Sequence, residues 1–120
     1  MSPELQDKLY KKYPALFAQH KLSMRETCMV WGICTGDGWY KILDQMCQKI
    51  QETGIPVQFS QVKEKFGTLR VYTDGSTDAV EDIITWAAKV SAVTCEECGE
   101  PGKMQRGGWL SVRCKECKKK

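Results

Sequence analysis

The chain has 120 residues, of which 42% are hydrophobic, and it includes four Trp, four Tyr and three Phe. This apolar content excludes an intrinsically disordered chain and is enough to build one compact core. No apolar run approaches the roughly 20 residues that cross a bilayer, and residues 1–4 start no secretory signal. We therefore expect a soluble protein in a reducing cytoplasm.

A short helix is predicted at the N-terminus. Ser2 stands in the capping position, Pro3 stands in the first helical position, and Pro14 ends the helix. Residues 23–26 then have the spacing of a capping box, but the apolar run beyond them fits a buried strand equally well. The sequence leaves residues 20–34 open between helix and strand.

The clearest helix follows a Gly-Asp-Gly turn at residues 36–38, and we expect Asp37 to cap it. Apolar residues then recur at steps of three and four, which predicts one buried helical face. They are Trp39, Ile42, Leu43, Met46, Cys47 and Ile50. Gly54 and Pro56 mark the end of this helix.

Residues 57–73 are predicted to form a β-hairpin, because β-branched and aromatic residues lie on both sides of a bend at residues 65–67. Gly67 supplies the backbone freedom that the bend requires. Arg70 lies inside the second strand and must face solvent or find an acidic partner. Glu64, across the bend, is the candidate partner.

A second amphipathic helix is predicted after the hairpin, with Thr77 or Asp78 as its cap. Its buried face comprises Val80, Ile83, Ile84, Ala87 and Val90. These elements predict an α+β fold, in which two main amphipathic helices pack on a small antiparallel β-hairpin. We expect a body over residues 1–94 and a zinc-ribbon-like segment over residues 95–120, packed on the body because almost no linker precedes it.

Two C-x-x-C pairs carry the strongest chemical signal, namely Cys95 with Cys98 and Cys114 with Cys117. Two residues between cysteines span one edge of the tetrahedron that zinc forms with four thiolates, and Gly99 lets the first loop turn. Four protein ligands leave no position for water, so we expect a structural Zn²⁺ ion.

Disulfides, a thioredoxin-like redox pair and an iron–sulfur cluster are the alternatives to this zinc site. The expected reducing compartment disfavours disulfides. The redox interpretation lacks the preceding hydrophobic strand that a thioredoxin-type motif requires. Zinc is therefore the cofactor that the cysteine spacing favours.

Positive charge is concentrated at the C-terminal end. Eleven basic and eleven acidic residues precede Cys95, so the whole formal net charge of +3 lies from Cys95 onward. The tail of Lys118, Lys119 and Lys120 suggests contact with a polyanion. A solvated charged tail is the alternative interpretation.

Other candidate contact residues lie on the hairpin and in the ribbon. Lys63, Lys65 and Arg70 are interleaved with aromatic residues, a pattern that fits nucleic-acid binding but also the simple protection of a sheet edge. Trp109 is expected to cover one side of the metal site, or to contact a partner if it is exposed. Arg106 is a further candidate contact.

Three more cysteines and the single histidine fit no metal pattern; they are Cys28, Cys34, Cys47 and His20. Free cysteines are among the most often buried residues, so we expect core packing, most clearly for Cys47. A Cys/His catalytic pair would need a spatial neighbour that the sequence does not reveal. The carboxylates form no recognisable metal-ion or nuclease signature.

Three stretches resemble a group of small proteins encoded by phages and prophages. They are Trp31-Gly32 followed by Gly36-Asp37-Gly38-Trp39, the Lys-Glu-Lys-Phe-Gly-x-Leu-Arg pattern within residues 61–72, and the cysteine segment with Gly108-Trp109 before its second pair. The resemblance implies the order of turn, helix, hairpin, helix and zinc-ribbon-like tail. It also implies a phage origin. Short phage accessory proteins commonly bind and block a host macromolecule, including components of bacterial defence.

The first functional hypothesis is a non-enzymatic, zinc-binding phage protein that binds a host protein complex in the bacterial cytoplasm and inhibits a defence system, in the manner of an anti-CRISPR protein. The second is a nucleic-acid-binding accessory or regulatory protein that uses the ribbon and the lysine tail. An enzyme ranks third, because the sequence offers no evident nucleophile, base or open metal position. The partner's identity and the oligomeric state stay open.

Overall fold

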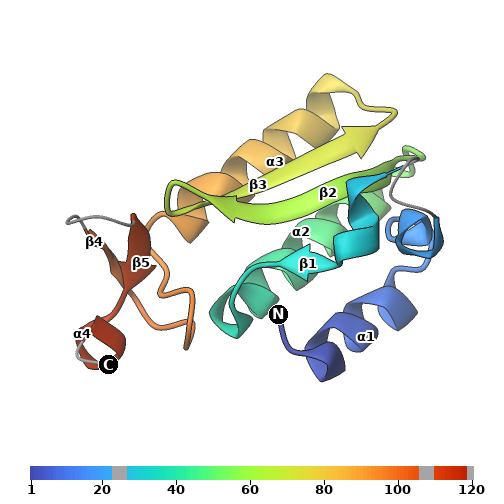
Figure 1. Cartoon of the computed structure of the whole chain (residues 1–120). Coiled ribbons are helices and arrows are strands. Elements are labelled where there is room, and N and C mark those ends of the chain that lie inside the picture. The colour runs from blue at the N-terminus through green and yellow to red at the C-terminus, as the bar shows by residue number, and fades with distance from the viewer. Residues whose placement is uncertain (23–26, 106–109, 119–120) are drawn as a thin grey trace.

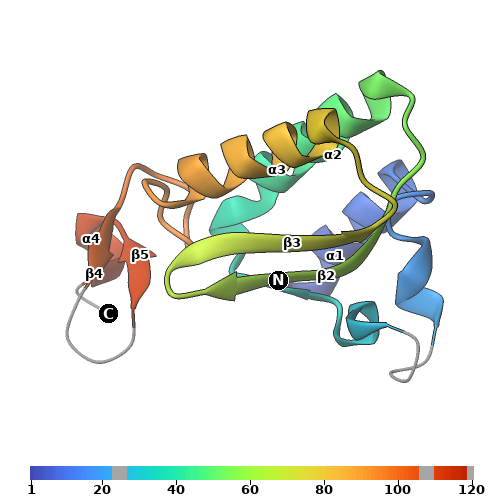
Figure 2. The same ribbon diagram turned by 90° about the horizontal axis from the view of Figure 1, so that it is seen from above.

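The computed structural model describes residues 1–22, 27–105 and 110–118. A three-stranded sheet in the order β1-β2-β3 forms the centre of the body. Its strands are β1 (Ile33–Cys34), β2 (Gln58–Lys65) and β3 (Thr68–Asp74). Helices α2 (Tyr40–Thr53) and α3 (Asp78–Ser91) cover one face of this sheet (Figures 1 and 2). The predicted α+β class is confirmed.

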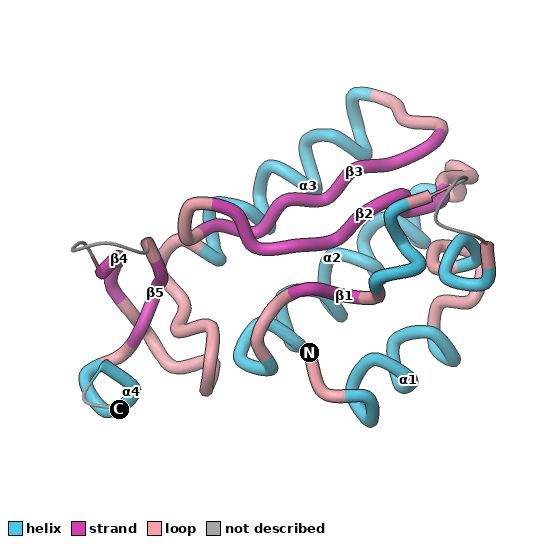
Figure 3. Tube along the Cα trace, in the orientation of Figure 1, coloured by secondary structure: helices cyan, strands magenta, loops and turns pink. Residues whose placement is uncertain are grey.

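The remaining elements surround this centre (Figure 3). They are helix α1 (Pro3–Lys12), three 3₁₀ turns (Ala18–Lys21, Cys28–Trp31 and Asp37–Trp39), strands β4 (Lys103–Gln105) and β5 (Ser111–Arg113), and the short helix α4 (Lys115–Lys118). Strands β4 and β5 form a separate two-stranded sheet. Among the described residues, no helix has the length and apolar character needed to cross a membrane.

Helix α1 closes the outer edge of β1. The Gln6 side chain accepts a hydrogen bond from the Ile33 backbone N–H at 2.6 Å, and the N-terminal ammonium of Met1 donates to the Ile33 carbonyl at 3.1 Å. These contacts satisfy backbone groups that an edge strand would otherwise leave open to another chain. A strand of two residues can therefore stay paired at this edge.

The hairpin bends at Phe66 and Gly67, which both have positive φ angles, of 54° and 83°. Positive φ at both central residues is the geometry of the two-residue turn that matches the natural twist of paired strands. The turn fixes the register, so that Lys65 lies opposite Thr68 and Lys63 lies opposite Arg70. The predicted position of Gly67 in the bend is confirmed.

The boundaries of the two main helices follow from their caps. Gly54 ends α2 in the left-handed conformation, with φ of 72°, and its N–H donates to the Gln51 carbonyl. Thr77, rather than Asp78, caps α3, since its hydroxyl accepts a hydrogen bond from the Val80 N–H at 3.5 Å. The left-handed end of α2 is the arrangement that a glycine just after a helix predicts.

The hydrophobic core lies in the body, between the sheet and helices α2 and α3. Trp39, Phe17 and Phe59 are completely buried there, and the rings of Phe17 and Phe59 meet edge to face with centroids 5.0 Å apart. Cys47 is also completely buried in this core, as predicted. Burial raises the pKa of its thiol far above the ordinary value, so this cysteine packs as an apolar side chain.

The predicted cap of α2 was wrong. Asp37 does not cap α2, because it lies in the 3₁₀ turn before that helix, and its carboxylate accepts a hydrogen bond from the Ser2 N–H at 2.6 Å. Ser2 occupies the capping position of α1, as predicted, although its side chain makes no capping hydrogen bond. Both residues serve the contact between α1 and the Gly-Asp-Gly turn instead.

The segment that the sequence left open contains a 3₁₀ turn, Cys28–Trp31, followed by β1. Strand β1 pairs with β2 in parallel, which adds a strand that the sequence did not predict. Cys28 and Cys34 are exposed, so the expectation of core packing was wrong for both. The capping box proposed at residues 23–26 lies outside the described residues.

Of the two alternatives for Arg70, the structure supports the first, because Arg70 is exposed and does not face the candidate partner Glu64. Arg70 lies opposite Lys63, whereas Glu64 lies opposite the buried Leu69. Side chains alternate between the two faces of a strand, so Glu64 and Arg70 point to opposite sides of the sheet. No ion pair to Arg70 forms within residues 1–22, 27–105 and 110–118.

Candidate metal centre

The structure brings together the four cysteines of the two C-x-x-C pairs. The sulfur atoms of Cys95, Cys98, Cys114 and Cys117 all lie within 4.8 Å of one another, and the sulfurs of Cys98 and Cys114 are 3.5 Å apart. None of the four forms a disulfide. Metal–sulfur bonds of about 2.3 Å would place tetrahedral thiolates about 3.8 Å apart. The four cysteines can therefore hold a metal ion.

The environment of the site favours the thiolate form at two of the sulfurs. Burial alone would raise the pKa of the Cys95 thiol, but backbone hydrogen bonds from Cys114 and Cys98 lower this pKa to about 6. The Cys117 backbone N–H donates to the sulfur of Cys114 at 3.4 Å and lowers the pKa of that thiol. Burial instead raises the pKa of Cys117. Two of the four sulfurs therefore favour the negatively charged thiolate form before any cation binds.

The first cysteine pair sits in a tight backbone turn. The Gly99 N–H donates to the Cys95 carbonyl at 2.9 Å, and the Cys95 N–H donates to the Glu100 carbonyl at 2.7 Å. Gly99 has a φ of 85°, a conformation that a residue with a Cβ rarely adopts. This glycine therefore allows the chain to turn back after Cys98, as its position in the sequence predicts.

The second pair is placed by β5 and α4. Strand β5 pairs with β4 and ends at Arg113, directly before Cys114, and Cys117 lies within the single turn of α4. The Glu96 N–H donates to the Val112 carbonyl at 3.0 Å and ties the first turn to β5. These hydrogen bonds bring the two pairs, which are 15 residues apart in the sequence, to one point.

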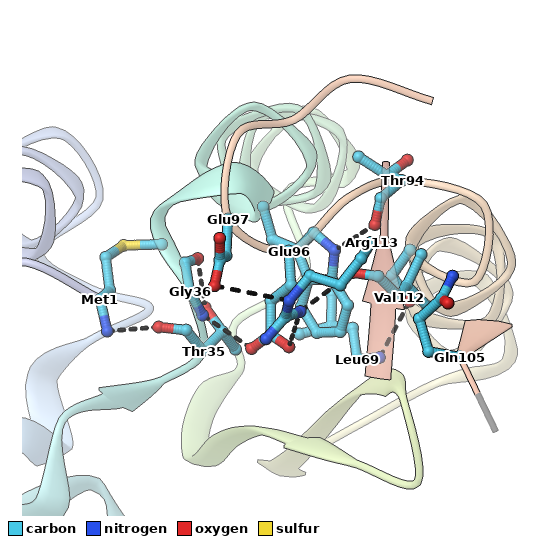
Figure 4. Close-up of polar contacts among 12 residues, drawn as sticks. Met1, Thr35, Gly36, Leu69, Thr94, Glu96, Glu97, Gln105, Val112 and Arg113 are labelled. Carbon is cyan, nitrogen blue, oxygen red and sulfur yellow. Dashed lines mark hydrogen bonds and ion pairs between the residues drawn. The ribbon is translucent and has the colours of Figure 1, made fainter. Parts of the chain in front are cut away.

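Glu96, between the first two cysteines, connects this cysteine turn to the body (Figure 4). Its carbonyl accepts a hydrogen bond from the Gly38 N–H at 2.7 Å, and its carboxylate accepts one from the Gly36 N–H at 2.8 Å. The same carboxylate lies 3.6 Å from the Arg113 guanidinium. One residue thus joins the Gly-Asp-Gly turn, the first cysteine pair and β5.

The glycines at positions 36 and 38 are required by this close contact. A Cβ on Gly38 would lie 2.3 Å from the Cys95 carbonyl oxygen and 2.6 Å from the Gly99 nitrogen. A Cβ on Gly36 would lie 2.3 Å from the Glu96 carbonyl oxygen. Distances below 3.0 Å to backbone atoms cannot be relieved by moving a side chain, so only glycine fits.

Two further contacts hold the ribbon against the body. The indole N–H of the buried Trp39 donates to the Thr94 carbonyl at 3.0 Å, just before the first cysteine. At the hairpin tip, a Cβ on Gly67 would lie 2.3 Å from the sulfur of Met104 in β4. The ribbon therefore contacts the Gly-Asp-Gly turn, the end of α3 and the hairpin tip.

Sequence reasoning missed this docking site, although its residues were visible. The Gly-Asp-Gly-Trp pattern at residues 36–39 was interpreted as a local turn and helix cap, whereas Gly36, Gly38 and Trp39 each contact the cysteine segment directly. Two glycines immediately before a buried tryptophan are the signal that could have indicated close approach of another backbone.

The structure places the predicted contact residues in different parts of the molecule. Lys63, Lys65 and Arg70 lie on the sheet face turned away from α2 and α3, and Lys118 ends α4. Arg106, Trp109, Lys119 and Lys120 lie outside the described residues. The structure therefore shows where the hairpin residues lie, whereas a contact made by the lysine tail stays a prediction.

The exposed cysteines and the histidine form no second centre in the described ranges. The cluster of Cys95, Cys98, Cys114 and Cys117 is the one group of three or more Cys, His, Asp and Glu ligand atoms found there. His20 stacks on the ring of Tyr10 with centroids 4.1 Å apart. That stacking gives the imidazole a packing role.

Comparisons of this chain with family models, with curated proteins and with solved structures find no match.

Proposed function

We propose that the four cysteines bind one zinc ion and that the ion has a structural role. The compact sulfur cluster supports this proposal, because its dimensions suit the tetrahedral thiolate coordination that zinc prefers. Four thiolates would occupy every position of a tetrahedral ion and leave none for a substrate or a water molecule. We therefore propose that the ion itself catalyses no reaction and that the protein acts by binding a partner.

We further propose that the protein is of phage origin, binds a host protein complex in the bacterial cytoplasm, and thereby inhibits a defence system. The observation that carries the binding proposal is Phe66 at the hairpin tip. This side chain is 64% exposed, and its backbone has a positive φ angle, a combination that is unfavourable both for a large apolar side chain and for its backbone.

Asparagine is the residue that a turn of this geometry prefers at the first central position. A phenylalanine at this position makes the folded protein less stable than an asparagine would. Strained, exposed residues of this kind cluster at functional sites. The ring is also an effective anchor for a protein interface, since aromatic side chains bury a large area at low conformational cost. The ammonium of Lys65 lies 5.5 Å from the ring centroid and adds charge beside this anchor.

The test compares three tagged baits in lysate from a bacterium that carries an active defence system. They are the unmodified protein, Phe66→Asn, and Val93→Asn, whose side chain is 62% exposed and follows the C-terminal end of α3. We expect the unmodified protein and Val93→Asn to retain one stoichiometric host protein complex. Phe66→Asn should lose it, although its free energy of unfolding rises by up to about 1 kcal/mol.

A second measurement asks about inhibition. Expression of the unmodified protein should restore plaque formation by a phage that the defence system restricts, and expression of Phe66→Asn should not. The proposal would be overturned if no complex were retained stoichiometrically, or if Phe66→Asn retained it and restored plaques as well as the unmodified protein does.

Nucleic-acid binding through the ribbon has weaker support than protein binding. Arg113 is engaged by two carboxylates, at 3.6 Å from Glu96 and at 3.5 Å from Glu97. This arginine is therefore largely neutralised within the ribbon. Lys63 and Arg70, on the sheet face turned away from α2 and α3, form no ion pair with any of the described residues.

A further inference from the structure

The two faces of the central sheet differ in what covers them. Val62 and Leu69 point toward α2 and α3 and are buried. The other face carries the alternate residues of β2 and β3, among them Lys63, Arg70 and Tyr72. Figure 2 shows both helices on one side of the sheet, and among the described elements no helix or strand lies over the middle of the other side. We call this uncovered side the open face.

The open face is positively charged. Lys63 lies directly opposite Arg70, and Lys65 lies one step closer to the hairpin tip. Like charges directly opposite each other on a sheet are destabilising. Within the described ranges neither Lys63 nor Arg70 forms an ion pair with a carboxylate. The one carboxylate among these outward strand positions, Asp74, lies at the far end and accepts a hydrogen bond from Gln19.

An aromatic ring stands beside these cations. Tyr72 lies opposite Gln61, one step along the strand from the pair of Lys63 and Arg70, and is 46% exposed. Residues two apart on a strand are separated by about 7 Å, so the surface from Thr68 to Tyr72 extends about 14 Å. A surface of this length can hold a few nucleotides of an extended strand.

We propose that the open face binds single-stranded nucleic acid. Lys63 and Arg70 contact backbone phosphates, and Tyr72 stacks against a base. Charge complementarity selects a polyanion, and the exposed ring beside the cations selects one with flat, accessible bases. A duplex presents its phosphates but keeps its bases stacked inside, so it cannot use Tyr72. This activity is additional to the protein contact proposed at Phe66 and uses different side chains.

The binding experiment uses the full-length, zinc-loaded protein and fluorescein-labelled oligothymidylate or oligouridylate. Fluorescence anisotropy is measured from about 50 mM salt upward, with an oligothymidylate–oligoadenylate duplex of the same length for comparison. We expect the single strands to bind more tightly than the duplex. Affinity should fall steeply with salt, because each neutralised phosphate releases counterions.

Three variants locate the site. Tyr72→Ala should weaken single-strand binding by roughly 5- to 150-fold, the range for loss of one stacked base. Lys63→Ala and Arg70→Ala should each weaken binding and reduce the slope of log affinity against log salt by about 0.7. Lys41→Ala is the matched control, because it removes the same charge from the exposed side of α2 and should change affinity less than twofold.

Several outcomes would overturn the proposal. They are the absence of single-strand binding at low salt, equal affinity for the duplex, an equal loss of affinity in Lys41→Ala, and binding that disappears only on deletion of residues 118–120. Competition by polyglutamate at the same charge concentration as the oligonucleotide would also overturn it. The open face would then bind an acidic protein surface as well as it binds nucleic acid. Phe66→Asn should bind oligonucleotide normally, so this result and the protein-capture result can fail independently.

Discussion

The body buries Trp39, Phe17 and Phe59 completely, whereas in the described ribbon Val112 is the one apolar side chain other than cysteine that is buried. Hydrophobic burial can therefore fold the body. It cannot fold the ribbon, because a segment this short removes too little apolar surface from water to offset the loss of chain entropy. The ribbon must draw its stability from two other sources, the proposed zinc ion and its contacts with the body.

The two regions are therefore vulnerable to different changes. The body should tolerate loss of the metal, because its core contains no cysteine ligand. The ribbon should lose its fold if either the zinc ion or the contacts with the body are removed. Its turns are short, and its hydrogen bonds converge on the cysteine segment and Glu96. The effect on the ribbon should therefore depend on which group is changed. It should decrease in the order of a metal ligand, a docking glycine, the Glu96 carboxylate and a residue of the body.

The largest expected effect comes from removal of one ligand. Cys98→Ser should release the metal and unfold the ribbon while the body remains folded, because structural zinc sites contribute about 10–16 kcal/mol of apparent binding free energy. Elemental analysis and amide hydrogen exchange measure the two consequences. Cys34→Ser is the control, since Cys34 is exposed and lies outside the cluster. Unfolding of the whole chain in Cys98→Ser would show that the two regions are not separable.

A smaller effect is expected when the docking surface is blocked. Gly38→Ala should destabilise the ribbon by about 1–3 kcal/mol, because the added Cβ would overlap backbone atoms of Cys95 and Gly99. Faster amide exchange in the ribbon measures this change. Gly54→Ala has open space but a left-handed backbone, so it should destabilise the body without changing exchange in the ribbon. Equal exchange rates in both variants would contradict the docking role of Gly38.

A change at the Glu96 carboxylate should be milder still. Glu96→Gln keeps the shape of the side chain but removes its charge beside Arg113, and we expect a loss of about 1 kcal/mol in ribbon stability. Glu97→Gln should cost less than about 0.5 kcal/mol, because the Glu97 side chain is 45% exposed and its ion pair is screened by solvent. Matched exchange measurements on the two variants distinguish the bridging role of Glu96 from the effect of net charge.

The smallest effect is expected in the body, at Asp44. Burial would raise the pKa of this carboxyl, but hydrogen bonds from the Tyr13 hydroxyl at 2.6 Å and the Lys12 ammonium at 2.9 Å lower it below its usual value. A lowered pKa in the folded state adds stability above the pKa of the unfolded state, and this stability is lost as pH falls through the folded pKa.

Asp44→Asn should therefore reduce stability by about 1 kcal/mol or less at neutral pH, after allowance for solvent screening. The difference from the unmodified protein should shrink as pH falls below the ordinary aspartate pKa, and it should vanish once pH lies below the lowered pKa of the folded state. Denaturant unfolding as a function of pH measures this, and amide exchange in the ribbon at neutral pH should stay unchanged. A difference that persisted in acid would mean that the carboxylate charge is not the cause.

The parts of the fold that the sequence predicted well are governed by local chemistry. Gly54 ends α2 because its left-handed conformation is intrinsic to glycine, and Gly67 bends the hairpin for the same reason. The four cysteines could be grouped because two-residue spacing within each pair is a property of the short loop. Such features need no knowledge of the rest of the chain.

The parts that sequence reasoning missed depend on distant segments. Strand β1 has two residues and is held by Gln6 and β2, so no local pattern marks it. Glu64 is a candidate partner of Arg70 only while the register of the hairpin is unknown, because a shift of one residue moves a side chain to the other face of a sheet. The glycines at positions 36 and 38 indicate close approach of another backbone, but they do not identify it as residues 95–99, which are distant in the sequence.

The most direct test of the zinc site measures the metal and the fold of the ribbon in the same sample. Isotopically labelled protein, purified without added metal and analysed for its elements, should contain one zinc ion per chain. Removal of the ion by a chelator should collapse the amide signals of the ribbon and shift the indole N–H of Trp39, while signals from the body core stay dispersed. Absence of stoichiometric metal, or a ribbon spectrum unchanged by the chelator, would contradict the account.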